Sequence, residues 1–258
     1  MNTILTYDGS FKGFLTCVFV AYEEKLEISD IQQQEKASEQ FFAKVQHVIT
    51  QDEKASRVAL AVNKKSSATG SSNLYKAFLS EEKGIEIMMF RYLEYMLESD
   101  RQIDQDFSHP AVLKIAQTAK KVGREKHRME AFVRFELTKD GIYFAKIEPD
   151  FHVLPLIKKH FEKRYADQKW IIYDLKRRFG LYYDLQKVNP VTFDFAHHFN
   201  AHTNNNSAFA AQEIEFKKLW KEYFNHTNIA SRKNTKLHLQ HVPKRYWKYL
   251  SEKSPLHN

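Results

Sequence analysis

The middle of the sequence constrains the fold more than any other part. Residues 131–137 and 141–149 alternate apolar with polar side chains, and the Thr-Lys-Asp-Gly sequence between them ends in a hairpin signal. A helical pattern follows over 152–168, and two further strand patterns lie at 169–175 and 180–185. We therefore expect a β-β-α-β-β unit, in which an antiparallel sheet carries the helix on one face.

The amino-acid composition favours a mixed fold over an all-β one. The chain has 258 residues, 43% of them hydrophobic, which suffices for one large domain or two small ones. Only seven glycines and six prolines are present, too few for the many turns of a barrel or sandwich. The sequence contains neither G-x-G-x-x-G nor a P-loop, which excludes glycine-rich phosphate loops. We predict the α+β class.

The first 100 residues are expected to form a mainly helical region. Its apolar spacing predicts, in order, a strand at 4–8, a helix at 9–25, a loop with a frayed helix at 29–40, a weak strand at 41–49, a helix at 52–64, a flexible break at 66–72 and a helix at 73–98.

Charge separates the two parts of the chain. Residues 1–100 hold 11 basic and 15 acidic side chains, whereas residues 101–258 hold 29 basic and 17 acidic ones. This asymmetry favours a polyanionic partner for the second part, most often nucleic acid. Lysines that only maintain solubility are the alternative. We expect a boundary near residue 100, followed by a basic α+β domain over 101–258 that ends in a helical, basic C-terminal part.

The single cysteine, Cys17, limits both redox chemistry and cofactors. No disulfide can form within the chain, so a reducing compartment, the cytoplasm, is expected. A cluster ligated by several cysteines cannot be built, and no cofactor is predicted. The sequence contains no signal-peptide pattern at residues 1–10 and no apolar run of membrane-spanning length, so no membrane partner is expected.

A basic stripe runs along the helix predicted from about residue 108. With Gln117 between the first two, the polar residues of this stripe are spaced three or four residues apart, so its cations share one face of the helix. They are Lys114, Lys121, Arg124 and Arg128. Because like charges at this spacing repel, the stripe either faces phosphate or forms an ordinary solvated face.

The stretch 244–249, Lys-Arg-Tyr-Trp-Lys-Tyr, interleaves cations with aromatic rings. Cations bind phosphates and aromatic faces stack on unpaired bases. Lys244 and Arg245 are therefore predicted to bind phosphate. Tyr246 and Trp247 either stack on bases or anchor the segment to the core. Three further predicted nucleic-acid contacts are Arg177, Arg178 and Arg232.

Candidates for catalysis are fewer. Asp8 follows a predicted strand, and Glu148 and His152 lie at a strand-to-helix junction, where acid–base groups often gather. Turn formation and helix capping explain the same positions. His197, His198 and His202 form either a metal site or a solvated Asn-rich loop, and the second is favoured because Cys and carboxylate ligands are missing. No metal is predicted.

Four blocks resemble one bacterial family of DNA repair or DNA metabolism proteins. They are ILTYDGSFKGFLTCVFVAYE (4–23), VGREKHRMEAFVRFE (122–136), IEPDFHVLPLIKKHFEKRYADQKWIIYD (147–174) and QHVPKRYWKYLSE (240–252). The resemblance implies a neighbouring radical-SAM protein, and a C-terminal domain of unknown function that also occurs fused to an iron–sulfur uracil-DNA glycosylase. It implies no catalytic residues.

Three functions are consistent with these features. The first is a DNA-binding accessory that presents DNA to a radical-SAM protein or a uracil-DNA glycosylase, whose clusters this chain cannot supply. The second is a repair enzyme, a glycosylase or nuclease, in which Asp8, Glu148 or His152 activates water. The third is an interaction module whose acidic N-terminal part binds a protein.

Overall fold

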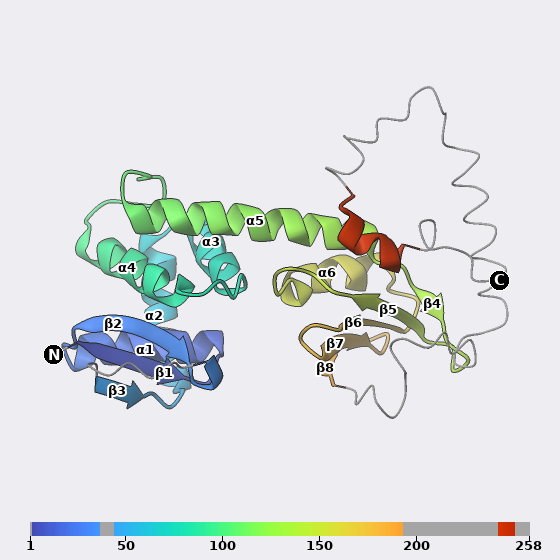
Figure 1. Cartoon of the computed structure of the whole chain (residues 1–258), viewed down its shortest axis with the longest axis horizontal. Helices are drawn as coiled ribbons and strands as arrows, with labels where there is room; N and C mark the ends of the chain where they lie inside the picture. Colours follow the sequence, from blue (N-terminus) through green and yellow to red (C-terminus); the bar gives the residue numbers. More distant parts are fainter. Residues whose placement is uncertain (1, 37–43, 193–241, 251–258) are drawn as a thin grey trace, which may run out of the picture. The chain divides into compact units, whose positions relative to one another are not determined.

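The computed structural model describes residues 2–36, 44–192 and 242–250 (Figure 1). The chain forms two compact units, residues 1–123 and 124–258, and helix α5 (Pro110–Phe132) contributes residues to both. The α+β class is confirmed: the first unit holds a parallel sheet and the second a mixed one. Across the described residues, every helix is too short or too polar to cross a bilayer.

The sheet of the first unit has the strand order β2-β1-β3, and all pairs are parallel. The central strand β1 (Thr3–Tyr7) is buried along its whole length, as expected of a strand covered on both faces. Its neighbours are β2 (Ile28–Gln33) and β3 (Lys44–His47). The loop expected over 29–40 is therefore wrong in its first part, because pairing with β1 overrides the polar local sequence.

Four helices accompany this sheet. They are α1 (Phe11–Glu23), α2 (Asp52–Lys65), α3 (Ala68–Phe78) and α4 (Ile85–Glu98). The break expected at 66–72 is wrong, because Ser67 accepts a hydrogen bond from the amide of Gly70 and starts α3 there. The single helix expected over 73–98 is two helices, and Gly84, with φ of 76°, precedes α4.

The second unit contains the predicted β-β-α-β-β unit and one further strand. The sheet order is β4-β5-β6-β7-β8. The elements are β4 (Glu136–Leu137), β5 (Tyr143–Ile147), α6 (Leu154–Arg164), β6 (Trp170–Asp174), β7 (Phe179–Tyr183) and β8 (Val188–Val191). The expected wholly antiparallel sheet is corrected at one pair, since β5 and β6 are parallel. Helix α6 carries the chain back across the sheet, so both strands start at the same end.

Aromatic side chains hold α6 against this sheet. The ring of Trp170, which is fully buried, lies 6.3 Å from that of Phe161 and 5.5 Å from that of Tyr183. Phe135 adds edge-on contacts to Phe161 and Tyr165. Most of the helical, basic C-terminal part expected from the sequence lies outside the described residues. Lys244–Tyr249 form a short 3₁₀ helix, η3.

Candidate nucleic-acid interface

Three carboxylates lie at one edge of the sheet in the second unit. Glu148 and Asp150 follow β5 directly, and Asp174 is the last residue of β6. Because β5 and β6 are parallel, their carboxyl ends meet at the same edge, where ligands of open α/β sheets usually bind. We call these carboxylates, their bound cations and the buried Glu125 of α5, whose contacts are given below, the strand-end network.

Asp174 is fully buried and organises the turn that follows it. It accepts hydrogen bonds from the amides of Lys176 (3.0 Å) and Arg177 (3.2 Å), and from Arg177 Nη1 (2.9 Å). Burial raises the pKa of Asp174, and the Arg177 guanidinium opposes that rise. Arg177 also donates to the carbonyl oxygens of Pro149 and Asp150, each at 3.2 Å, and so links the ends of β5 and β6.

Helix η3, which we call the docking segment, packs onto this edge. Tyr246 is its anchor: it is 1% exposed, its ring lies 5.6 Å from that of Phe132, and its hydroxyl donates to Glu125 Oε1. Glu125, also 1% exposed, accepts from Arg245 Nη2 (3.3 Å) and from the amide of Asp150 (2.9 Å). One buried carboxylate on α5 therefore joins the docking segment to the loop after β5.

Two further contacts fasten the docking segment at Glu148. The carboxylate of Glu148 accepts from the Tyr249 hydroxyl (2.6 Å) and pairs with the Lys248 ammonium. Those two hydrogen bonds, the one from Lys248 first, lower the pKa of Glu148. Arg245 Nη2 lies 2.7 Å from Asp150 Oδ2. Each of these carboxylates is thus matched by a cation from 244–249.

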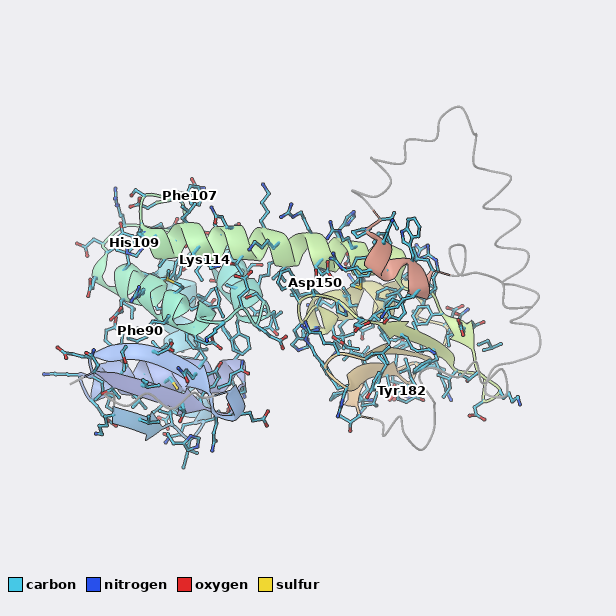
Figure 2. The ribbon with its side chains drawn as sticks, viewed as in Figure 1. Phe90, Phe107, His109, Lys114, Asp150 and Tyr182 are labelled. Carbon is cyan, nitrogen blue, oxygen red and sulfur yellow. The ribbon has the colours of Figure 1, made fainter. Side chains whose placement is uncertain are left out.

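Several predicted phosphate contacts are therefore occupied by carboxylates. Lys114 and Lys121 both bind Glu82, at 2.7 and 3.1 Å, within the first unit (Lys114 is labelled in Figure 2). Arg128 Nη1 lies 3.5 Å from Glu125 Oε2. The side chains that occupy these cations are the ones that sequence reasoning missed: Glu82, Glu125 and Asp150. Only Glu125 lies within a basic run in the sequence, whereas Glu82 and Asp150 are distant from the cations that they bind, so no local signal marked them.

The two aromatic residues of the docking segment differ in accessibility. Tyr246 is buried, so its ring packs on the protein and is closed to a base. Trp247 is half-buried, and its indole N–H donates to the carbonyl of Val242 at 3.0 Å. The anchoring alternative for Tyr246 is therefore the one that the structure contains.

Other cations of the second unit remain at the surface. Among the described residues, the exposed side chains that form no ion pair in the structure include Arg124 on α5, Lys159 and Lys163 on α6, Lys169, Arg178 in the β6–β7 turn, Lys187 and Lys244. Three of these, Arg124, Arg178 and Lys244, were predicted to contact phosphate. Arg178 has φ of 58°, so its backbone conformation is part of the turn after Asp174.

The remaining candidates lie elsewhere. Asp8, in the first unit, accepts from the Ser10 amide (2.9 Å), the Ser10 hydroxyl (2.7 Å) and the Thr50 hydroxyl (2.8 Å). Burial acts to raise the pKa of Asp8, but these hydrogen bonds outweigh it and lower the pKa. His152 is half-buried, with its ring 5.1 Å from that of Phe179. Arg232, His197, His198 and His202 lie outside the described residues.

A metal centre is not apparent in the part of the chain that the structure describes, since no three His, Cys, Asp or Glu side chains there are placed to share an ion.

Comparison with protein families matches residues 83–252 to a domain of unknown function, DUF4130. The chain belongs to the DUF4130 family. The matched range includes α4 and ends shortly after the docking segment, so the docking segment is part of the DUF4130 domain. It leaves out β1, α1 and α2 of the first unit.

Other comparisons add little to the DUF4130 assignment. No curated protein matches the chain. Among solved structures, the chain is similar to a pGpG-specific phosphodiesterase, PggH from Vibrio cholerae, with 11% identity over 70% of this chain and 80% of that one. The TM-score is 0.35, too low to support any inference about function.

Proposed function

We propose that the second unit binds the phosphate backbone of DNA, and that the chain is a DNA-binding accessory of DNA repair or metabolism. The distribution of charge carries this proposal. Residues 124–258 hold 25 basic and 15 acidic side chains, whereas residues 1–123 hold 15 and 17. The boundary between the units is thus also a boundary in charge, and an excess of this size attracts polyanions.

The surface cations without an ion pair are the proposed contacts, with Arg124, Arg178 and Lys244 foremost. An ion-paired cation must give up its carboxylate before it can bind phosphate, whereas an exposed cation only releases water. Lys114, Lys121 and Arg128 are consequently secondary to the three named first. The resemblance to DNA repair proteins supplies the biological context, in which a radical-SAM protein or uracil-DNA glycosylase would be the partner that acts on the DNA.

The test compares two triple variants that remove equal charge. Arg124→Ala/Arg178→Ala/Lys244→Ala should lower the slope of log affinity against log salt by about 3, roughly one per phosphate contact. The matched control, Lys114→Ala/Lys121→Ala/Lys126→Ala, removes three cations that bind Glu82 or Glu130 and should change the slope by less than about 1. Fluorescence anisotropy with single-stranded and duplex oligonucleotides measures both.

Either of two results would overturn this function. The wild-type chain could show no DNA affinity at low ionic strength, or the two triple variants could lose affinity equally. In the second case the binding depends on net charge alone and no defined surface exists.

A second candidate function is hydrolysis of a phosphodiester or N-glycosidic bond of DNA, favoured by the place of Glu148 at the carboxyl end of a parallel strand. Its lowered pKa keeps Glu148 ionised at neutral pH, so it could serve as a general base but not as an acid. Turnover on a panel of lesion-bearing oligonucleotides, lost in Glu148→Gln, would support this function. A panel without turnover would reject it.

A further inference from the structure

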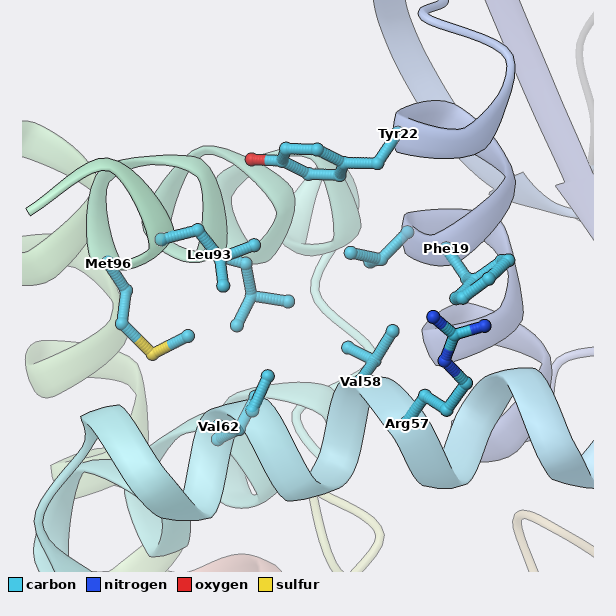
Figure 3. Close-up of a pocket in the computed structure, with 10 residues that line it drawn as sticks. Phe19, Tyr22, Arg57, Val58, Val62, Leu93 and Met96 are labelled. Carbon is cyan, nitrogen blue, oxygen red and sulfur yellow. The ribbon is translucent and has the colours of Figure 1, made fainter.

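An apolar groove of about 200 Å³ lies between α1, α2 and α4 of the first unit (Figure 3). Its walls are Val18 and Phe19 of α1, Val58 and Val62 of α2, and Leu93 of α4. Sites for small molecules usually measure about 300–1,000 Å³. This groove is smaller than that, and suits one or two inserted side chains.

The rim of the groove leaves apolar surface in contact with water. Tyr22 is 43% exposed and extends from α1 toward α4, as Figure 3 shows. Phe19 and Leu97 are half-buried beside it. Exposed aromatic surface around a concave apolar site is typical of protein interfaces.

Beside Tyr22, on the neighbouring face of α4, two carboxylates that line a separate pocket with Arg91 carry unfavourable negative charge. Glu94 and Glu98 lie four residues apart in the last turns of α4, where they repel one another and also face the negative end of the helix dipole. Burial, and then the charges of Glu94 and Glu98, raise the pKa of Tyr22 to about 12. Burial and then Glu98 raise the pKa of Glu94, against the opposing charge of Arg91. A cation placed here from outside would relieve this repulsion.

Arg91 is the basic side chain next to Glu94, and three other nearby cations are engaged elsewhere. Lys65 donates to the carbonyl oxygens of Leu97 (2.5 Å) and Ser99 (3.0 Å), and so caps the backbone of α4. Lys54 pairs with Glu23 at 2.6 Å. Arg57 lies over the ring of Phe19, 4.8 Å from its centroid.

We propose that this groove docks an amphipathic helix of a partner protein, which inserts one or two apolar side chains and places a lysine or arginine at Glu94 and Glu98. Helix-in-groove recognition needs an apolar slot and charges beside it, and both are present. The site lies in the first unit, so it is independent of phosphate binding by the second. It is also built partly from α1 and α2, which the DUF4130 match leaves out.

Two labelled peptides of about 15 residues test the proposal against the full-length chain. Both carry leucine at helical spacing, and the remaining positions are lysine in one and glutamate in the other. We expect the basic peptide to bind about tenfold more tightly. The net charge of +8 on the whole chain would favour the acidic peptide, so a preference for the basic one indicates a local acidic site, which the variants below locate.

Variants locate the binding. Ala61→Met fills the groove and should weaken binding of the basic peptide about tenfold. The matched control is Leu60→Met, on an exposed residue of the same helix that does not line the groove, and it should leave the affinity unchanged. Glu94→Gln/Glu98→Gln should reduce the preference for the basic peptide to about threefold or less. Tyr22→Lys adds a cation at the exposed rim and should weaken that peptide even if Ala61→Met folds poorly.

The proposal fails if the two peptides bind equally, if neither binds, or if Ala61→Met and Tyr22→Lys both leave binding unchanged. Sedimentation of the chain alone provides a further check. A dimer that Ala61→Met dissociates would identify a second copy as the occupant and overturn the assignment to a different protein.

Discussion

Each unit places a carboxylate directly after a parallel strand, but the two carboxylates are held by different kinds of hydrogen-bond donor. Asp8 follows the central parallel strand of the first unit, and all its hydrogen-bond donors are neutral groups of Ser10 and Thr50. Glu148 follows a parallel strand of the second unit, and it is held by the Lys248 ammonium and the Tyr249 hydroxyl, about 100 residues further along the chain. One carboxylate shapes a local turn, and the other fastens a distant segment.

This difference shows why position alone does not identify a catalytic group. The turn at Asp8 is complete with residues from two neighbouring loops. The edge at Glu148 is complete only when residues 244–249 are in place. Its main contact is an ion pair, in which both Glu148 and Lys248 are charged. We expect the two sites to differ in how strongly they depend on buried charge, on backbone space and on salt.

The largest effect is expected at Glu125, the buried centre of the strand-end network. Glu125→Ala leaves Tyr246 and Arg245 without their shared acceptor, so the free energy of unfolding should fall by about 3 kcal/mol. Glu130→Ala, on the same helix but in a more exposed pair with Lys126, should cost less than about 1 kcal/mol. Urea denaturation measures both, and equal losses would show that Glu125 is not the centre of the network.

An intermediate effect is expected at Gly13, which leaves room for the Asp8 carboxylate. A Cβ there would overlap Asp8 Oδ1 and lie 2.8 Å from Thr50 Oγ1, so Gly13→Ala should destabilise the chain by roughly 2 kcal/mol. Gly123→Ala is the control: a Cβ there meets nothing within 4 Å, and the helix should gain about 0.5–1 kcal/mol. Thermal unfolding distinguishes them, and a neutral Gly13→Ala would mean that the Asp8 turn is dispensable.

The smallest effect is expected from salt. At about 1 M salt the screening length falls to roughly 3 Å, so hydrogen exchange of residues 242–250 should quicken a fewfold as the exposed Lys248–Glu148 pair weakens. Exchange of the Ser10 amide, which donates to Asp8, should change less, because the donors to Asp8 are uncharged and the nearest exposed ion pair, Lys12–Asp52, does not involve Asp8. Quickening of both regions alike would remove the distinction between the sites.

Acid should affect both sites in the same direction. The pKa values of Asp8 and Glu148 are lowered in the folded chain, so their stabilising contribution is present at neutral pH. The ordinary pKa values are 3.8 for Asp8 and 4.5 for Glu148. The stabilising contribution is lost progressively as the pH falls from these ordinary values through the lowered pKa values of the folded chain. Hydrogen exchange between pH 6 and pH 3 measures this loss, and protection of residues 242–250 that persisted at pH 3 would contradict the role given to Glu148.

The sequence predicted elements better than it predicted how they pair. The hairpin at Asp140–Gly141 and the strand at 170–174 follow from local patterns, since turn residues and alternation act over a few positions. The parallel pairing of β5 with β6 depends on the path of α6, which no local pattern records. Likewise β2 is polar in sequence and forms only because β1 lies beside it.

The candidate site shows the same limit. Spacing correctly placed Lys114 and Lys121 on one face of a helix. The partner that they share, Glu82, lies in the loop between α3 and α4, 32 residues away from Lys114. Similarly, Arg245 and Tyr246 meet Glu125 across more than 100 residues. Long-range ion pairs determine which cations remain available to bind phosphate. A local reading of the sequence shows the cations but not the distant carboxylates that pair with them.

The distance in sequence between Glu125 and Tyr246 also bears on how the chain is made. All residues of the first unit have been synthesised by Gly123, so that unit can fold while the ribosome is still translating the rest. The second unit must wait until Tyr246 has emerged, and meanwhile the Glu125 carboxylate stays hydrated and the edge beside it open. Chains stalled before this point would carry a finished first half and an unfinished second one, an obvious substrate for quality-control proteases.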